Sequence, residues 1–176
     1  MAVYTAKNLF ITGKPGSGKT TLIREACLPY MDKAGGFYTE EIIEDGKRGG
    51  FVIKTFSGRQ GVLARKGMPS AHKLNKYGID VSVLEGIAVK ELERAVETKP
   101  LIVIDEIGSM EIISESFRKT LVRCFASGAR VLATIRYNAQ PFTDEIKKMP
   151  DSELIVLTRE NHEEIKRRVR EWMSLI

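Results

Sequence analysis

Cysteine is scarce in this 176-residue chain, which has only Cys27 and Cys124. A disulfide framework would need more cysteines, and both of these fall in segments with helical patterning. We therefore expect two buried, reduced thiols in a cytoplasmic protein. Long hydrophobic runs are also missing, since none approaches the roughly 20 residues that cross a bilayer. The apolar stretch at residues 9–12 is too short for a secretory signal, so we expect neither a cleaved leader nor a membrane span.

Histidine is equally rare, and the chain has no repeats and no low-complexity linker. His72 and His162 have no companions at the spacing of metal ligands, which predicts no zinc site. Hydrophobic residues make up 43% of the chain and charged residues 29%, a balance typical of a folded protein rather than a disordered one. We predict a single domain over residues 1–176.

The net charge of +5 and the pI of about 9.2 permit a polyanionic partner without requiring one. Much of the basic excess lies near the C-terminus, where Ile165, Val169, Trp172 and Ile176 recur at helical spacing. This pattern puts the neighbouring basic residues on the opposite, solvated face of a helix. We favour that interpretation over a nucleic-acid-binding face, and nucleic acid stays a permitted but less favoured partner.

Short apolar runs alternate with longer helical patterns, which favours an α/β fold with a largely parallel sheet. The expected strands cover residues 9–12, 37–43, 101–104, 130–135 and 154–157. The expected helices cover residues 19–30, 82–97, 114–127 and 143–148, followed by an amphipathic C-terminal helix capped by Thr158 or Asn161. In residues 44–80, turn signals at Asp45-Gly46 and Ser57-Gly58 separate two short β-like runs, so we predict an antiparallel hairpin insertion there.

The segment after the first strand matches G-x-x-x-x-G-K-[ST] at every specified position. Glycines there allow main-chain N–H groups to surround a phosphate at the start of a helix. Lys19 is predicted to reach the β- and γ-phosphates, and the Thr20 hydroxyl to bind Mg²⁺. Lys14 adds a positive charge that contacts either phosphate or water. The residues expected to hold the triphosphate are Gly13, Lys14, Pro15, Gly16, Ser17, Gly18, Lys19, Thr20 and Thr21.

A second polar signal follows the apolar run at residues 101–104, where Asp105 and Glu106 come in succession. A continuous apolar run is typical of a strand buried on both faces, and its C-terminal end opens at the ligand crevice. Asp105 is therefore our candidate for the Mg²⁺ shell and for nucleotide binding. Glu106 is predicted to orient and deprotonate an attacking water. One strand later, Thr134 either senses the γ-phosphate or simply fills a strand position.

These segments together resemble the THEP-type nucleoside-triphosphatases, small cytoplasmic P-loop proteins, over nearly the whole chain. The resemblance rests on GKPGSGKTTLI at the phosphate loop, GFYTEEI (36–42), RGGF (48–51), GVLAR (61–65), IDEIGSME (104–111), LATI (132–135) and TREN (158–161). It implies a P-loop NTPase fold with three α/β/α layers, a sheet of order 5-1-4-3-2 that the hairpin extends, and a catalytic glutamate. It also implies slow, Mg²⁺-dependent hydrolysis of ATP, GTP and other triphosphates.

The chain departs from this resemblance at Arg136-Tyr137-Asn138, where we expect a small or proline-containing turn after LATI. Hydrolysis also needs a cation against the charge that develops in the transition state. Arg48 and Arg65 occupy arginine positions of the family segments, and we favour Arg48 as the catalytic cation. Otherwise a partner protein or a neighbouring subunit supplies it in trans.

Two other functions stay open at this point. A small nucleotide kinase would share the phosphate loop, and Arg48, Arg59 and Arg65 in the hairpin would have to form its lid. A nucleotide-gated module acting on RNA or DNA would use the basic C-terminal helix, and its turnover would respond to polynucleotide. We prefer the NTPase to both.

Overall fold

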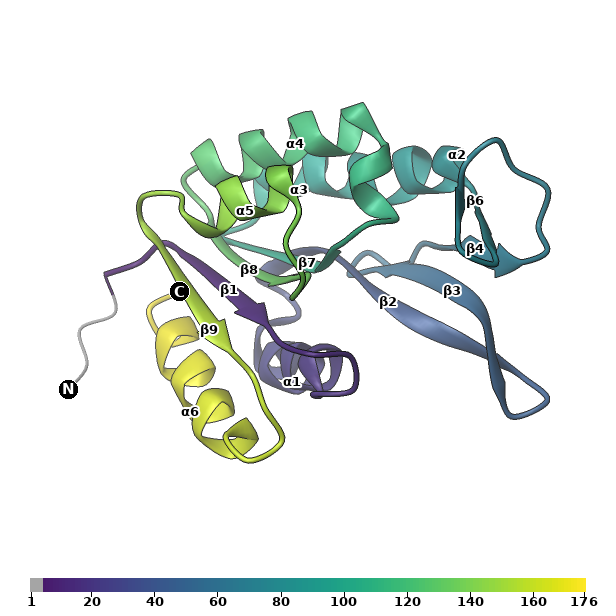
Figure 1. The fold of residues 1–176 in the computed structure, drawn as a ribbon. Helices are drawn as coiled ribbons and strands as arrows, with labels where there is room; N and C mark the ends of the chain where they lie inside the picture. Colours follow the sequence, from purple (N-terminus) through teal and green to yellow (C-terminus); the bar gives the residue numbers. More distant parts are fainter. Residues whose placement is uncertain (1–4) are drawn as a thin grey trace.

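A computed structural model describes residues 5–176, which form one nine-stranded sheet covered by helices (Figure 1). The strands are β1 (Asn8–Thr12), β2 (Ala34–Glu44), β3 (Lys47–Thr55), β4 (Gln60–Lys66), β5 (Lys73–Leu74), β6 (Tyr77–Ile79), β7 (Leu101–Ile107), β8 (Arg130–Ile135) and β9 (Ser152–Val156). The helical segments are α1 (Lys19–Cys27), η1 (Leu28–Tyr30), α2 (Val81–Val83), η2 (Leu84–Val89), α3 (Lys90–Thr98), η3 (Glu111–Ile113), α4 (Glu115–Ala126), α5 (Pro141–Lys147) and α6 (His162–Met173).

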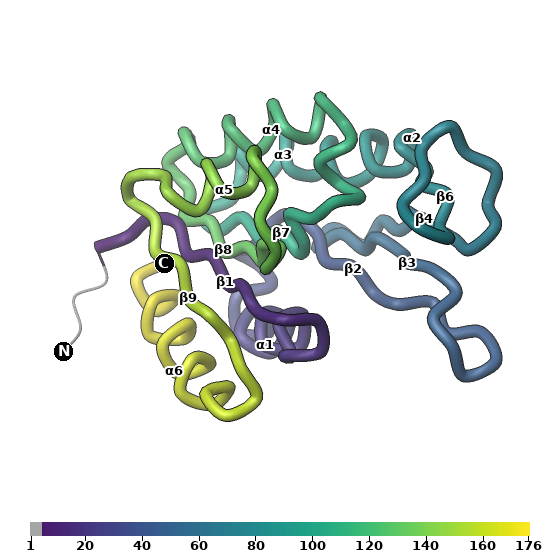
Figure 2. Tube along the Cα trace, viewed as in Figure 1, coloured from purple at the N-terminus to yellow at the C-terminus, as the bar shows by residue number. Residues whose placement is uncertain are grey.

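The sheet has the order β5-β6-β4-β3-β2-β7-β8-β1-β9. Its five parallel strands, β9-β1-β8-β7-β2, follow the predicted order 5-1-4-3-2 when they are numbered among themselves. The full order differs from that prediction because four antiparallel strands extend the sheet beyond β2. Figure 2 shows these strands at the opposite end of the sheet from β9, with α2 beside β4 and β6.

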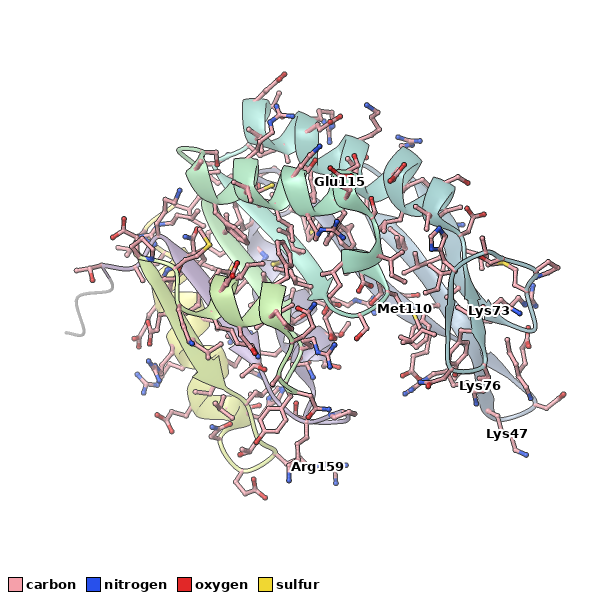
Figure 3. All side chains as sticks on the ribbon, turned by 45° about the horizontal axis from the view of Figure 1, so that its top comes forward. Lys47, Lys73, Lys76, Met110, Glu115 and Arg159 are labelled. Carbon is pink, nitrogen blue, oxygen red and sulfur yellow. The ribbon has the colours of Figure 1, made fainter. Side chains whose placement is uncertain are left out.

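Strands β3 to β6 lie within the predicted insertion, residues 44–80, but they are four strands and not the two of a hairpin. Strand β3 begins at Lys47, before the apolar run from which it was predicted. This early start was not predicted because the first residues of β3 are polar or glycine and show no β-like pattern. Strands β5 and β6 were missed because two- and three-residue strands are too short for a periodic signal. Exposed lysines are spread over this extension, including Lys47, Lys73 and Lys76 (Figure 3).

Two hydrophobic clusters pack on opposite faces of the parallel strands, as the alternation of side chains along a strand requires. In β1, Phe10 packs in the cluster beneath η2, α3, α4 and α5, while Leu9 and Ile11 pack in the cluster with α1 and α6. The two helical layers lie above and below the sheet in Figure 1. The predicted three-layer α/β/α architecture is confirmed.

The helices largely follow the predicted ranges. The helix expected at residues 82–97 is a continuous segment of α2, η2 and α3, in which η2 is a π-helix, and Asp80 caps its start by accepting a bond from Val83 N at 3.1 Å. In α6, Ile165, Val169 and Trp172 are buried as predicted.

The basic residues of α6 largely pair with acids of the same chain: Lys166 with Glu25, Arg167 with Glu171 and Arg168 with Glu153. Asn161 holds the N-cap position of this helix, but the predicted side-chain cap is wrong, because its Oδ1 accepts a bond from Thr158 N at 2.8 Å instead of from a helix N–H. Within residues 5–176, the structure contains no helix with the length and apolar character of a membrane span.

Candidate active site

The phosphate loop joins the end of β1 to the start of α1, and its glycines are structurally required. Gly16 and Gly18 have φ angles of +80° and +93°, which side-chain-bearing residues rarely adopt. A Cβ on Gly13 would lie 2.5 Å from the carbonyl oxygen of Leu157. The loop therefore keeps a wrapped main chain at the N-terminus of α1, where N–H groups and the helix dipole favour an anion.

Two side chains at the start of α1 point into this region. The Lys19 Nζ donates to the carbonyl oxygen of Gly13 at 2.8 Å, so the ammonium group lies within the loop. The Thr20 Oγ1 donates to Asp105 Oδ1 at 3.2 Å. This bond joins the phosphate loop to the acidic end of β7, two segments that are 85 residues apart in the chain.

Asp105 is completely buried near the end of β7. Its Oδ1 also accepts a bond from Thr134 Oγ1 at 2.5 Å. Its Oδ2 has no hydrogen-bond partner among the residues that the structure describes. Burial raises the pKa of Asp105, and the bonds from Thr134 and Thr20 partly oppose this rise.

Glu106 lies beside Asp105 but faces a cavity of about 790 Å³, large enough for a nucleotide. Burial raises the pKa of Glu106, and the nearby charges of Lys19 and Arg136 partly oppose this rise. Most of the phosphate loop lines the same cavity. The remaining wall includes Arg24, Thr39, Glu40, Ser109, Tyr137 and Asn138.

Some predicted residues lie away from this cavity. Lys14 is exposed and Ser17 is buried, and neither lines the cavity wall, although both belong to the loop. Arg48 does line the wall, where it forms an ion pair with Glu41. Its Cζ lies 5.5 Å from the centre of the Phe51 ring.

The other hairpin arginines have partners of their own. Arg65 pairs with Glu44, and Arg59 donates to the carbonyl oxygen of Gly86 at 2.9 Å. Neither is among the described residues that line the cavity.

Sequence reasoning missed two residues of this region. Arg136 lines the cavity, and its only signal was its presence where a small or proline-containing turn was expected. Glu111 is buried behind Glu106, and its Oε2 accepts a bond from Gly108 N at 3.2 Å. Burial and the charge of Glu106 raise the pKa of Glu111 to about 8. Both residues follow central strands: Glu111 begins η3 after β7, next to Met110, which Figure 3 labels, and Arg136 begins the loop after β8.

The donors available for a metal are few. No group of three or more His, Cys, Asp or Glu side chains is arranged to hold a metal within residues 5–176. Thr20 and Asp105 instead offer a hydroxyl and a carboxylate next to the phosphate loop. Such a set suits a cation that takes its other ligands from phosphate and water, as Mg²⁺ does.

Comparison with known proteins gives consistent results. A family model described as NTPase matches residues 8–170. The nucleoside-triphosphatase THEP1 of Thermotoga sp. strain RQ2 is 46% identical over 153 residues, which cover 87% of each chain. The crystal structure of THEP1 from Aquifex aeolicus superposes with a TM-score of 0.86 at 35% identity, covering 94% of this chain and 98% of that one. The solution structure of a human cancer-related nucleoside triphosphatase superposes with a TM-score of 0.81 at 31% identity, covering 96% and 97%.

Proposed function

Since the chain belongs to the NTPase family, we propose that it hydrolyses nucleoside 5′-triphosphates to diphosphate and phosphate with Mg²⁺ as its metal. One observation carries the proposal: the hydrogen bond from Thr20 to Asp105 joins the phosphate loop to the acid pair, and Glu106 faces the cavity that the loop lines. A triphosphate tail bound by the loop would therefore face Glu106 directly, whereas the buried Asp105 would act through the Thr20 hydroxyl and the metal.

The family implies a divalent cation, and the residues present fit Mg²⁺. Asp105 Oδ2 is buried without a hydrogen-bond partner among the described residues, and it leaves a lone pair free beside the Thr20 hydroxyl. We assign Thr20 and Asp105 as the protein side of the metal shell. When bound there, Mg²⁺ neutralises charge on the β- and γ-phosphate oxygens.

Lys19 and Glu106 are the proposed catalytic side chains. The Lys19 ammonium now bonds to a loop carbonyl, and it can turn to the β- and γ-phosphate oxygens. Glu106 is a suitable general base because it faces the cavity that the loop lines, and because burial raises its pKa and so makes it a stronger base. It would take a proton from the water that attacks the γ-phosphorus.

We propose a broad base range that includes ATP and GTP, because main-chain N–H groups recognise phosphate rather than any base edge. The family resemblance supports the same range. We also propose a cytoplasmic location and a single domain, and the two free, buried cysteines agree with a reducing compartment.

The experiment that tests the proposal measures initial rates of phosphate release from each common triphosphate, with and without Mg²⁺, for the wild type and for Lys19→Ala. We expect release from several triphosphates, dependent on Mg²⁺, and its loss in Lys19→Ala. Chromatography of the products separates the alternatives, because a kinase would phosphorylate an acceptor instead of releasing phosphate. A rate that rises only with added RNA or DNA would favour the nucleic-acid module. Absence of release from every triphosphate would contradict the proposal.

A further inference from the structure

Arg136 begins the loop after β8, at the carboxyl end of two central strands. It follows Thr134 by two residues, and Thr134 donates to Asp105. The main-chain N–H of Arg136 donates to the carbonyl oxygen of Ile107 at 3.2 Å, which ties the loop to the end of β7. Its position is therefore fixed by the strand that carries the acid pair.

The Arg136 side chain is held without being neutralised. Its Nη1 donates to Ser109 Oγ at 2.6 Å and its Nε donates to the carbonyl oxygen of Asn138 at 3.1 Å, and both acceptors are uncharged. Among residues 5–176 it forms no ion pair. Its guanidinium therefore brings a full positive charge to the cavity wall that it shares with Lys19 and Glu106.

Arg48, the cation expected from the sequence, has a different environment. It lines the same cavity, but its charge is compensated by the ion pair with Glu41. The third arginine of the cavity wall, Arg24, is likewise paired, with Glu40. Among the described residues, Arg136 is thus the cavity-lining arginine without an acidic partner, and it shares that wall with Glu106.

We propose that Arg136 is a catalytic residue that stabilises, from within the same chain, the negative charge developing on the γ-phosphate during hydrolysis. This inference rests on the proposed function. In the step, the water oxygen bonds to the γ-phosphorus while Glu106 accepts a water proton. The bond from the γ-phosphorus to the β–γ bridging oxygen breaks, and its electron pair leaves with the diphosphate. Arg136 donates N–H bonds to the γ-phosphate oxygens, and the products are diphosphate and phosphate.

An arginine in this role contributes about 10³ to 10⁵ in kcat in P-loop hydrolases. Its planar fork donates two bonds at once, which a lysine cannot reproduce. Arg136→Ala should therefore lower kcat by at least about 100-fold and leave KM within about threefold of the wild type, because the contact forms in the transition state. Arg136→Lys should restore only part of the loss.

The test measures kcat and KM for wild type, Arg136→Ala, Arg136→Lys, Arg48→Ala and Arg59→Ala. Arg59 is the matched control, because its guanidinium bonds to Gly86 outside the cavity. Calorimetry measures the affinity of each protein for diphosphate alone and for diphosphate with aluminium fluoride, a mimic of the transition state. We expect Arg136→Ala to bind diphosphate normally and to lose the aluminium fluoride complex, with thermal unfolding unchanged.

If the wild type is active, any of three results would overturn the inference. These are near-normal turnover in Arg136→Ala, a loss in Arg136→Ala that is confined to KM and diphosphate affinity, or a large loss of kcat in Arg48→Ala alone. A wild type that releases no phosphate would instead contradict the proposed function itself. The two failures are therefore distinguishable.

Discussion

At the scale of single residues, three carboxyl groups in one short segment have three different environments. Asp105 is buried and accepts hydrogen bonds from two threonine hydroxyls. Glu106 faces the cavity near two cations. Glu111 is buried behind it and bonds to the main-chain N–H of Gly108. These surroundings suit Asp105 to its proposed role as a metal ligand and Glu106 to its proposed role as a base, although the side chains are nearly the same chemically.

Glu111 makes stability depend on pH. Its pKa is about 8 in the folded protein and 4.5 when unperturbed, so between these values unfolding releases its proton. Its stabilising contribution is complete below pH 4.5 and is lost as the pH rises towards 8. Glu111→Gln stays neutral throughout. We expect the variant to match the wild type near pH 4.5 and to exceed its free energy of unfolding by at least about 1 kcal/mol near pH 8.

Urea denaturation of both proteins at the two pH values, without nucleotide or metal, checks this expectation. Taking the difference between the proteins cancels the titration of groups that they share. A difference in stability that is the same at both pH values would show that Glu111 does not hold a proton in the folded state.

The sequence predicts some of these residues well and others poorly. Asp105 and Glu106 are predicted because an apolar run precedes them, and the loop glycines because they fit the spacing of a phosphate loop. Arg136 was noticed only as a departure, since a loop has no periodicity from which to judge where a side chain points. In the sequence, Glu111 resembles an ordinary surface acid. It is buried in the structure, and no sequence pattern indicates this burial.

At the scale of elements, β2 carries the transition between the two parts of the sheet. Residues 34–37 pair in parallel with β7, and residues 37–44 pair antiparallel with β3. Gly36 lies at this transition with a φ of +114°, and a Cβ there would collide with the carbonyl oxygen of Val103 in β7. The close approach of β2 to β7 therefore requires glycine.

Gly36→Ala should destabilise the protein more than Gly58→Ala. Both positions have a positive φ, +114° and +90°, so both variants lose roughly 1–2 kcal/mol from backbone strain. Only Gly36 has a main-chain neighbour in the way, because nothing lies within 4 Å of a Cβ at Gly58. Crowding adds roughly 1–3 kcal/mol. Thermal unfolding compares the two variants, and equal losses would contradict the described approach of β2 to β7.

The parallel strands and long helices were predicted because they repeat a pattern over many residues. The antiparallel extension was only partly predicted, since its pairing depends on contacts between strands that are each too short to show alternation. The sequence also did not predict which side chains pair across the antiparallel extension. Arg65 meets Glu44, and Arg48 meets Glu41, through the register of β2, β3 and β4.

At the scale of the whole molecule, one sheet separates two cores, and each contains one cysteine. Cys27 packs with the α1 and α6 cluster, and Cys124 with the cluster beneath α4. Burial raises the pKa of each thiol to about 12, so both should be unreactive in the folded protein. The shared strands should make the two cores unfold together.

Labelling across a urea series checks this cooperativity. Brief pulses of a thiol reagent, followed by mass spectrometry, report how far Cys27 and Cys124 are exposed at each urea concentration. We expect both cysteines to become reactive at the same midpoint, as a two-state transition requires. Two separate midpoints would mean that one face of the sheet loses its helices while the other stays packed.

The central claim is that Glu106 activates the water that attacks a triphosphate held by the loop, and Glu106→Gln tests it most directly. We predict that this variant binds Mg²⁺ and triphosphate with an affinity within about threefold of the wild type, while phosphate release in a single turnover falls by roughly 10² to 10⁴. Glu115→Gln is the control, because Glu115 lies on the outer helical layer (Figure 3), where it pairs with Lys119. Phosphate release by Glu106→Gln at the wild-type rate would contradict the account.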